Sequence, residues 1–349
     1  MAQSRIAIVG TGLIGTSIGL ALARAKDRKY EIIGIDRDRN NSRAAKKMGA
    51  IDREAGSLEE ALDGTAVTFL AVPVMSARRL LEDMGPFLAA GAIVTDTCST
   101  KSDLMRWAAE FLPEEVHFVG GHPMAGREKS GPSAATADLF HEATWAIAPS
   151  PRAAEEAVQV VLGLVESMGA IPFYIDGAEH DQWAAAVSHL PLLASVALFR
   201  MVRDSQGWED AALIAGPGFK DMTRLASGDA VMARDIMVTN RDAVLHWLGR
   251  FEEELHNLRK ALDEGDERIY DVFAATQLDR DVYITNPITR RKPEGTSAPS
   301  AGDQMGQLLL GAGLYGKLKD MPDRAAERTR ANNGALRRKL GARDDDSAR

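Results

Sequence analysis

One cysteine and few aromatic side chains mark this sequence of 349 residues, in which Cys98 is the only thiol and aromatic residues make up 6%. A single cysteine excludes an intrachain disulfide, which favours a reducing compartment, and we expect a cytoplasmic protein. No apolar run reaches the roughly 18 residues that a membrane-spanning helix needs. The first residues lead into a strand-like segment without the pattern of a secretory signal. We therefore expect no membrane partner.

Basic residues are also in short supply, because 42 Lys and Arg face 50 Asp and Glu, for a formal net charge of −8. Nucleic-acid-binding surfaces are basic, so this balance argues against a nucleic-acid partner. The length suits two domains of roughly 100–200 residues each. Residues 286–349 depart from the rest, with 13 Lys and Arg against 8 Asp and Glu. We expect this segment to be a charged, partly disordered tail.

The glycine-rich stretch Gly10-Thr11-Gly12-Leu13-Ile14-Gly15 follows a strand-like run over 5–9 and precedes a helical pattern over 16–25. Such a G-x-G-x-x-G turn is typical of dinucleotide binding, because the glycines allow a tight turn, close approach of a pyrophosphate and close helix packing. The pyrophosphate then meets the positive end of the helix dipole.

A second strand-like run, 30–35, ends at Asp36, whose carboxylate is placed to accept hydrogen bonds from the adenosine ribose hydroxyls. This acid favours NAD over NADP, although Arg37 and Arg39 could neutralise a 2′-phosphate. The cofactor-binding residues that we assign are Gly10, Gly12, Leu13, Ile14, Gly15 and Asp36.

Strand-like and helical patterns continue to alternate as far as residue 176, which predicts a Rossmann-like, doubly wound and mostly parallel sheet over 1–176. From 177 to 285 only helical patterns follow, so we expect an all-helical domain for substrate binding and dimerisation. Its long apolar pattern over 178–203 is interrupted by Pro191. The apolar face of this pattern motivates the prediction of a homodimer.

His122 lies in the stretch Gly120-Gly121-His122-Pro123, which we expect to form a glycine-rich turn after a strand over 116–119. Open α/β sheets bind ligands at the carboxyl ends of their strands. A histidine there is either a catalytic group or a cap on a surface turn, and the stretch alone leaves both readings open.

Together with four other stretches, this one makes the chain resemble the prephenate/arogenate dehydrogenase family of tyrosine biosynthesis over roughly residues 5–283. The resemblance rests on the order of five stretches, at 10–15, 96–101, 121–131, 187–191 and 216–224. It implies NAD-dependent oxidation of ring C4 of a cyclohexadienol with loss of the ring carboxylate as CO2. Prephenate would then give 4-hydroxyphenylpyruvate, with arogenate or an amino-substituted prephenate as alternative substrates.

The resemblance also implies roles for individual residues. His122 matches the family's catalytic histidine, and Ser99 matches the serine that hydrogen-bonds the substrate hydroxyl. Arg224 matches a carboxylate-binding arginine, since a guanidinium can hold a carboxylate with two parallel bonds. His189 matches a second histidine at the substrate, and Glu128 an acidic residue at the pocket mouth. No residue is assigned to a metal.

Two other functions stay open at this point. A β-hydroxyacid type of NAD(P)-dependent dehydrogenase would place a lysine on the long helix, but residues 180–198 contain none. A dinucleotide sensor without catalysis would need no set of His122, Ser99 and Arg224. Within the family, Ala233 stands where some members have tryptophan, which leaves the choice of substrate open. The tail lacks the alternating strands and helices of an ACT regulatory domain, so we expect none.

Overall fold

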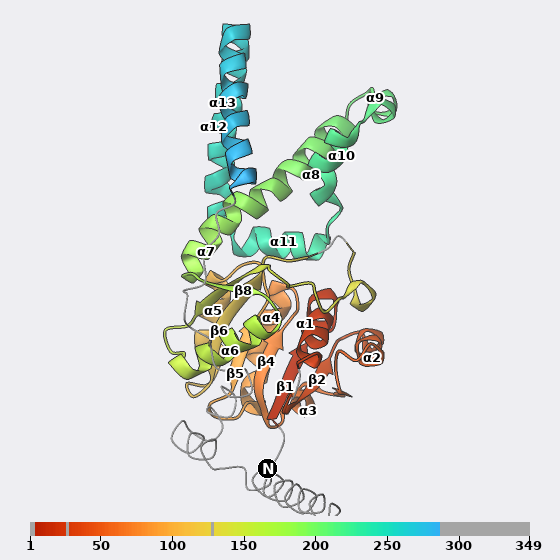
Figure 1. The fold of residues 1–349 in the computed structure, drawn as a ribbon, viewed down its shortest axis with the longest axis vertical. Coiled ribbons are helices and arrows are strands. Elements are labelled where there is room, and N and C mark those ends of the chain that lie inside the picture. The colour runs from red at the N-terminus through yellow and green to blue at the C-terminus, as the bar shows by residue number, and fades with distance from the viewer. Residues whose placement is uncertain (1–3, 26–27, 127–128, 287–349) are drawn as a thin grey trace, which may run out of the picture. The chain divides into compact units, whose positions relative to one another are not determined.

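The computed structural model describes residues 4–25, 28–126 and 129–286, and in this part of the chain eight strands form one sheet in the order β3-β2-β1-β4-β5-β6-β7-β8 (Figure 1). Strands β1 to β6 run parallel, β7 is antiparallel to β6, and β8 is parallel to β7. The first six strands follow the order of a dinucleotide-binding fold. The prediction of a doubly wound, mostly parallel sheet is confirmed. The strands are β1 (Ser4–Val9), β2 (Tyr30–Ile35), β3 (Arg53–Glu54), β4 (Thr65–Leu70), β5 (Ile93–Asp96), β6 (His117–Pro123), β7 (Thr144–Pro149) and β8 (Ile171–Tyr174).

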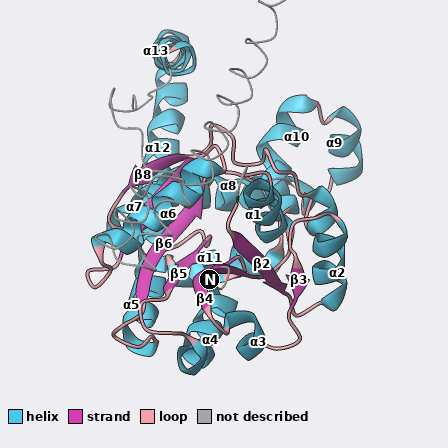
Figure 2. Cartoon of the chain, turned by 60° about the horizontal axis from the view of Figure 1, so that its bottom comes forward, coloured by secondary structure: helices cyan, strands magenta, loops and turns pink. Residues whose placement is uncertain are grey.

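Helices cover both faces of this sheet (Figure 2). One face packs Ala7 and Val9 of β1 into an apolar core with the α4 and α5 helices. The neighbouring residue Ile8 points to the opposite face, where it meets α1 at Gly15. Burial of both faces explains why β1 carries apolar side chains at consecutive positions from Ile6 to Val9. The helices that connect the strands are α1 (Leu13–Ala23), α2 (Arg39–Lys47), α3 (Leu58–Leu62), α4 (Val74–Met84), η1 (Gly85–Phe87), α5 (Ser102–Phe111), η2 (Pro132–Ala134) and α6 (Glu155–Ser167).

The prediction of a glycine-rich turn at His122 is wrong, because residues 120–123 belong to β6 and pair with β7. Neither Gly120 nor Gly121 has a positive φ. Glycine is needed at 121 for space instead, since a Cβ there would lie 2.5 Å from the Asp96 carbonyl oxygen and 2.8 Å from Trp145 Nε1. His122 is therefore held by strand pairing, which gives its backbone a fixed position.

The helical part begins at Gly177 and contains only helices among the residues described beyond it. They are α7 (Gly177–Ala184), η3 (Ala185–His189), α8 (Leu190–Arg203), α9 (Trp208–Ile214), α10 (Pro217–Thr223), η4 (Arg224–Ser227), α11 (Ala230–Thr239), α12 (Arg241–Glu264) and α13 (Asp266–Thr285). The expected all-helical second domain is thus present. Within it, α11 and α12 meet at Asn240, and α13 ends at Thr285.

Pro191 does not end the long helix, because the turn before it widens into the π-helix Ala185–His189. Proline has no N–H, and its ring collides with the carbonyl four residues earlier in a regular α-helix. The wider turn relieves this conflict, and Pro191 then occupies the first turn of α8, where no N–H is required. Single π turns of this kind often occur at functional sites.

By length and composition alone, the helical run Gly177–Arg203 could also cross a membrane, because a window of 18 residues within it has a mean hydropathy of 1.6. The run is not an uninterrupted apolar stretch, because His180, Asp181 and His189 lie within it. Part of the run has apolar partners within the chain, since Ala185 and Leu193 pack against Ala243 and Val244 of α12.

Polar contacts fix the helical part on the carboxyl edge of the sheet, where α7 and α11 lie in Figure 1. The Asp235 carboxylate accepts from the Met75 amide at 3.2 Å, and the hydroxyls of Thr239 and Thr100 are 2.9 Å apart. The buried carboxylate of Asp181 accepts from two amides at the start of α5. This edge is where parallel sheets of this class bind ligands.

Candidate active site

The glycine turn after β1 leaves space at one position only. Gly10 has a φ of +94°, and a Cβ there would lie 2.3 Å from the Ala71 carbonyl oxygen. A Cβ on Gly15 would lie 1.9 Å from the Gly10 carbonyl oxygen, so both glycines are required by packing. At Gly12, by contrast, a Cβ would meet nothing within 4 Å. Gly12 caps α1 without a side-chain hydrogen bond, so no cap side chain satisfies the first amides of the helix, which include those of Leu13 and Ile14. The turn therefore fits a pyrophosphate.

Asp36 lies beside this turn. Its Oδ2 accepts from the Thr11 amide at 2.7 Å, and its Oδ1 accepts from the Asp38 amide at 2.9 Å and from Asn41 Nδ2 at 3.3 Å. The Thr11 hydroxyl lies 3.4 Å from Oδ2 as a fourth donor, so these bonds fix the orientation of the carboxylate beside the turn. The charge that would repel a 2′-phosphate remains in place.

His122 ends a chain of three side chains whose hydrogen atoms can be assigned. The ionised carboxylate of Asp181 can only accept, so His180 Nδ1, at 2.9 Å from Asp181 Oδ1, carries a hydrogen. In neutral His180 the Nε2 atom then accepts, and its partner at 2.9 Å, His122 Nδ1, must donate. The remaining nitrogen of neutral His122, Nε2, is therefore a proton acceptor.

The surroundings keep His122 neutral. Burial lowers the pKa of His122 well below its usual range, and the nearby His180, Lys101 and His189 lower it further. The side chain is nevertheless half-buried, so one side of it stays accessible. Asp181 shows the opposite balance: burial by itself would raise its pKa, but hydrogen bonds from His180, Ser102 and Lys101 outweigh burial and lower it. At neutral pH the site thus holds an ionised carboxylate behind an uncharged base.

His189 presents a donor without a partner. Asn240 Nδ2 donates to the Asp181 carbonyl oxygen at 2.7 Å, which orients the amide, and its other hydrogen faces His189 Nδ1 at 3.1 Å. His189 Nδ1 therefore accepts, and Nε2 carries the hydrogen. That Nε2 atom is buried and has no hydrogen-bond partner in the described chain. Burial lowers the pKa of His189 to about 4, against the effect of Asp181. A buried N–H of this kind is suited to an acceptor on a ligand.

The other predicted site residues, Ser99, Arg224 and Glu128, lie outside this network of histidine hydrogen bonds or outside the described residues. Ser99 follows β5 and is half-buried, one residue after Cys98, whose amide is held by the Asp96 carboxylate. Arg224 begins η4 and is exposed, beside α8 and α10. Within the described residues the hydrogen bonds that join the three histidines do not include it. Glu128 lies outside the described residues.

Sequence reasoning missed His180, Asp181 and Asn240. Their signal is weak, because His180 and Asp181 sit in the first turns of a helix capped by Asp176, where polar residues are ordinary. Asn240 falls within what reads as one long helical pattern. The described residues contain no group of three or more His, Cys, Asp or Glu side chains arranged to hold a metal.

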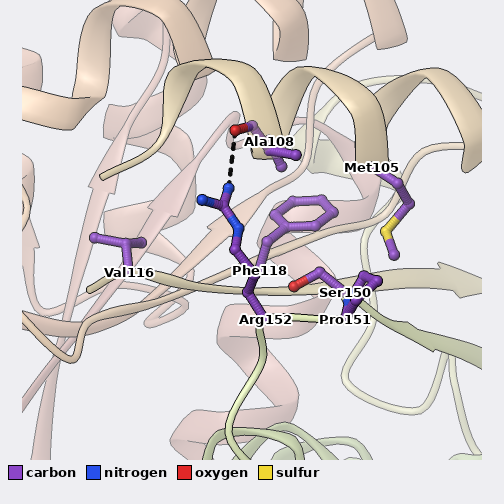
Figure 3. Close-up of a pocket in the computed structure, with 8 residues that line it drawn as sticks. Met105, Ala108, Val116, Phe118, Ser150, Pro151 and Arg152 are labelled. Atoms are coloured by element: carbon purple, nitrogen blue, oxygen red, sulfur yellow. Dashed lines mark hydrogen bonds between the residues drawn. The ribbon is translucent and has the colours of Figure 1, made fainter. Parts of the chain in front are cut away.

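A pocket of about 260 Å³ lies elsewhere, under the second half of α5 (Figure 3). It is bordered by Phe118 near the start of β6 and by Arg152, whose guanidinium donates to the Ala109 carbonyl oxygen at 2.9 Å. Phe118 and His122 are about 13 Å apart along an extended strand. This pocket is therefore separate from the histidine cluster.

The sheet order and the open glycine turn place this protein among the dinucleotide-binding proteins. Two family models narrow that class. Residues 18–173 match the prephenate dehydrogenase nucleotide-binding domain, and residues 176–275 match the prephenate dehydrogenase dimerization domain. The chain belongs to the prephenate dehydrogenase family.

Individual relatives agree with this assignment. A prephenate dehydrogenase of Bacillus subtilis is 32% identical over 282 residues, which are 80% of this chain and 76% of the relative. A cyclohexadienyl dehydrogenase of Zymomonas mobilis is 28% identical over 75% of this chain and 89% of its own.

Solved structures are similar too. The prephenate dehydrogenase from A. aeolicus in complex with hydroxyphenyl propionate and NAD+ has a TM-score of 0.74 and 29% identity, covering 80% of this chain and 98% of that one. The Synechocystis arogenate dehydrogenase has a TM-score of 0.69 and 28% identity, covering 80% and 99%. The family assignment sets aside the β-hydroxyacid dehydrogenase and the non-catalytic sensor.

Proposed function

We propose that the protein oxidises prephenate to 4-hydroxyphenylpyruvate and CO2 with NAD as the hydride acceptor. The observation that carries this proposal is the hydrogen-bond chain from Asp181 through His180 to His122, which leaves His122 Nε2 as the acceptor. Removal of a hydride from ring C4 requires the hydroxyl proton to move to a base. A neutral, half-buried imidazole with a carboxylate behind it is suited to that transfer.

The protein residues divide the work in this proposal. His122 takes the hydroxyl proton while C4 becomes a carbonyl, and the positive charge that develops on the imidazole is stabilised through His180 by Asp181. The ring carboxylate then leaves as CO2, its electron pair makes the ring aromatic, and His122 returns the proton to the phenolate oxygen. NAD supplies the hydride-accepting nicotinamide when it is bound.

Other residues bind and orient. Ser99 holds the substrate hydroxyl, because a serine hydroxyl can donate and accept at once. His189 offers its buried Nε2 hydrogen to an oxygen of the substrate. Arg224 and Glu128 act at the carboxylate end and the pocket mouth, by resemblance to the family. Gly10, Gly12, Leu13, Ile14, Gly15 and Asp36 hold the cofactor.

Arogenate is the second candidate substrate, because the similar Synechocystis structure is an arogenate dehydrogenase. The deciding experiment measures NAD reduction by the purified full-length chain with prephenate and with arogenate under the same conditions. A larger kcat/KM for prephenate supports the proposal. A larger value for arogenate replaces the substrate, and no reduction with either compound refutes the activity.

We further propose that the protein is a cytoplasmic homodimer, and that the boundary between the two domains of each chain lies near residue 176. The dimerization-domain match and large exposed apolar side chains on the helical part support the dimer, including Val187 at 74%, Met201 at 68% and Leu213 at 86% exposure. Sedimentation of the full-length chain and of a variant ending at Thr285 tests this. If both the full-length and the shortened protein sediment as monomers at micromolar concentration, the proposed dimer is refuted. If only the shortened protein is a monomer, the dimer contact belongs to the tail.

A further inference from the structure

Two fully buried charges lie next to the proposed site and take no part in the steps above. Lys101 and Asp96 are both 0% exposed, at the carboxyl end of β5, and the Lys101 ammonium is hydrogen-bonded to Asp96 Oδ2. A buried ion pair is weak support for stability, because desolvation of both groups offsets their attraction. Their retention in the core therefore needs another reason.

The Asp96 carboxylate holds the residue before each of the two proposed catalytic side chains. Its Oδ1 accepts from the Gly121 amide at 3.0 Å, and Gly121 precedes His122. Its Oδ2 accepts from the Cys98 amide at 2.8 Å, and Cys98 precedes Ser99. One carboxylate thus connects the loop that carries Ser99 with the strand that carries His122.

Lys101 connects the carboxylate of Asp96 to the carboxylate of Asp181. Its amide donates to Asp181 Oδ1 at 2.7 Å, the same oxygen that accepts from His180. Its aliphatic stem passes between two glycines: a Cβ at Gly120 would lie 3.2 Å from Lys101 Cδ, and one at Gly177 would lie 3.4 Å from Lys101 Cβ. The backbone around Lys101 is therefore shaped to admit this side chain.

We propose that Asp96 and Lys101 are positioning residues that fix the separation of Ser99 and His122 and align the His180–Asp181 pair behind His122. This inference rests on the proposed function, because it concerns the geometry of the same site. Proton transfer requires placement within a few tenths of an ångström, and a displacement of about 1 Å can cost about 10²-fold in rate.

Two variants separate positioning from charge. Lys101→Met leaves Asp96 buried without its cation. The double variant Asp96→Asn/Lys101→Met removes both charges, so it avoids an unpaired buried ion. However, one amide oxygen cannot replace both carboxylate oxygens, so the Gly121 or the Cys98 amide loses its acceptor. We expect both variants to lose about 10- to 100-fold in kcat, while the Kd for NAD stays within about threefold of the wild type.

The matched control is Arg28→Met. Arg28 makes two bonds to Asp52, at 2.9 and 2.6 Å, and that carboxylate accepts from the Ile32 amide at 2.8 Å. This pair also fixes a strand through a carboxylate, but at β2 and away from the histidines. Its variant should lower Tm and leave kcat unchanged.

A second measurement does not depend on turnover. Nitrogen-15 NMR of labelled histidines reports the ionisation of His122. The ionisable groups nearest to His122 are His180, Lys101 and His189. Asp181 is hydrogen-bonded to His180, and Asp96 is hydrogen-bonded to Lys101. Loss of the Lys101 charge should raise the pKa of His122 in the single variant. In the double variant the two removed charges have opposite signs, so the pKa should return close to the wild-type value.

The outcomes decide the proposal. A kcat loss in the double variant with a near wild-type pKa of His122 supports positioning. A double variant that keeps wild-type kcat, or one that loses no more than Arg28→Met, overturns it. Wild-type protein without any turnover would refute the proposed function instead, and the NMR measurement would still test the coupling of Lys101 to His122.

Discussion

Replacement of Asp181 by asparagine tests the hydrogen-bond chain that the structure assigns. The carboxylate receives three donors: the Lys101 amide, the Ser102 amide and His180 Nδ1. An amide group offers one oxygen and one NH2, so either orientation of the new side chain leaves at least one backbone donor facing a donor. The two orientations differ in what they do to the histidines.

If the new amide oxygen faces His180, the chain keeps its direction but loses its charge. A hydrogen bond to a charged group contributes roughly 1.5–3 kcal/mol, which corresponds to about 10- to 150-fold in rate. If the NH2 faces His180, it donates to Nδ1 and reverses the chain. His180 Nε2 then donates to His122 Nδ1, and His122 Nε2 carries a hydrogen. In that state the base cannot accept a proton, and general-base help of roughly 10²–10⁴-fold is lost.

We therefore expect Asp181→Asn to lower kcat by about 10- to 10⁴-fold, depending on which orientation the amide takes, with the Kd for NAD little changed. The assay is steady-state NAD reduction at saturating substrate, together with nitrogen-15 NMR of the tautomer of His122. Asp235→Asn is the matched control, because Asp235 is equally buried at the same edge of the sheet and accepts from the Met75 amide without touching a histidine. A loss below about 10-fold, or one no larger than that of Asp235→Asn, would refute the assigned chain.

Three further outcomes are expected. Log kcat/KM should rise with pH through one ionisation and be level at neutral pH, because the neutral ring of His122 is the active form. The pKa of this ionisation should lie below the usual histidine value of about 6.5, because burial lowers the pKa of His122. His122→Asn should lose roughly 10²–10⁴-fold in kcat and lose this acidic limb; a limb that persists unchanged would assign the base to another residue. Arg224→Ala should raise KM for the substrate about 10- to 100-fold through loss of a charge-assisted pair, and an unchanged KM would exclude the role. Asp36→Ser should narrow the preference for NAD over NADP in kcat/KM, and a wild type that uses both equally well would contradict the assignment of Asp36.

The sequence could predict the cofactor end of the molecule because its signals are local. The turn from Gly10 to Gly15, the strand before it and the helix after it belong to one continuous segment, and Asp36 ends the next strand. Glycine spacing and apolar runs report such units directly, so the doubly wound sheet and the helical second part could also be predicted. The resemblance to the family drew attention to His122 and His189 by their motifs.

Only the tertiary structure decided how the histidines work. His122 and His180 are 58 positions apart in sequence, and they meet because α7 folds onto the carboxyl edge of the sheet. The strand conformation of residues 120–123 depends on pairing with β7, for example Gly121 with Ile147, and glycines give no local sign of it. The pKa of His122 likewise falls below the value expected from the isolated side chain, because burial and neighbouring charges are properties of the folded chain. Local patterns specify turns and periods, whereas the direction of a hydrogen-bond chain depends on which distant side chains packing brings into contact.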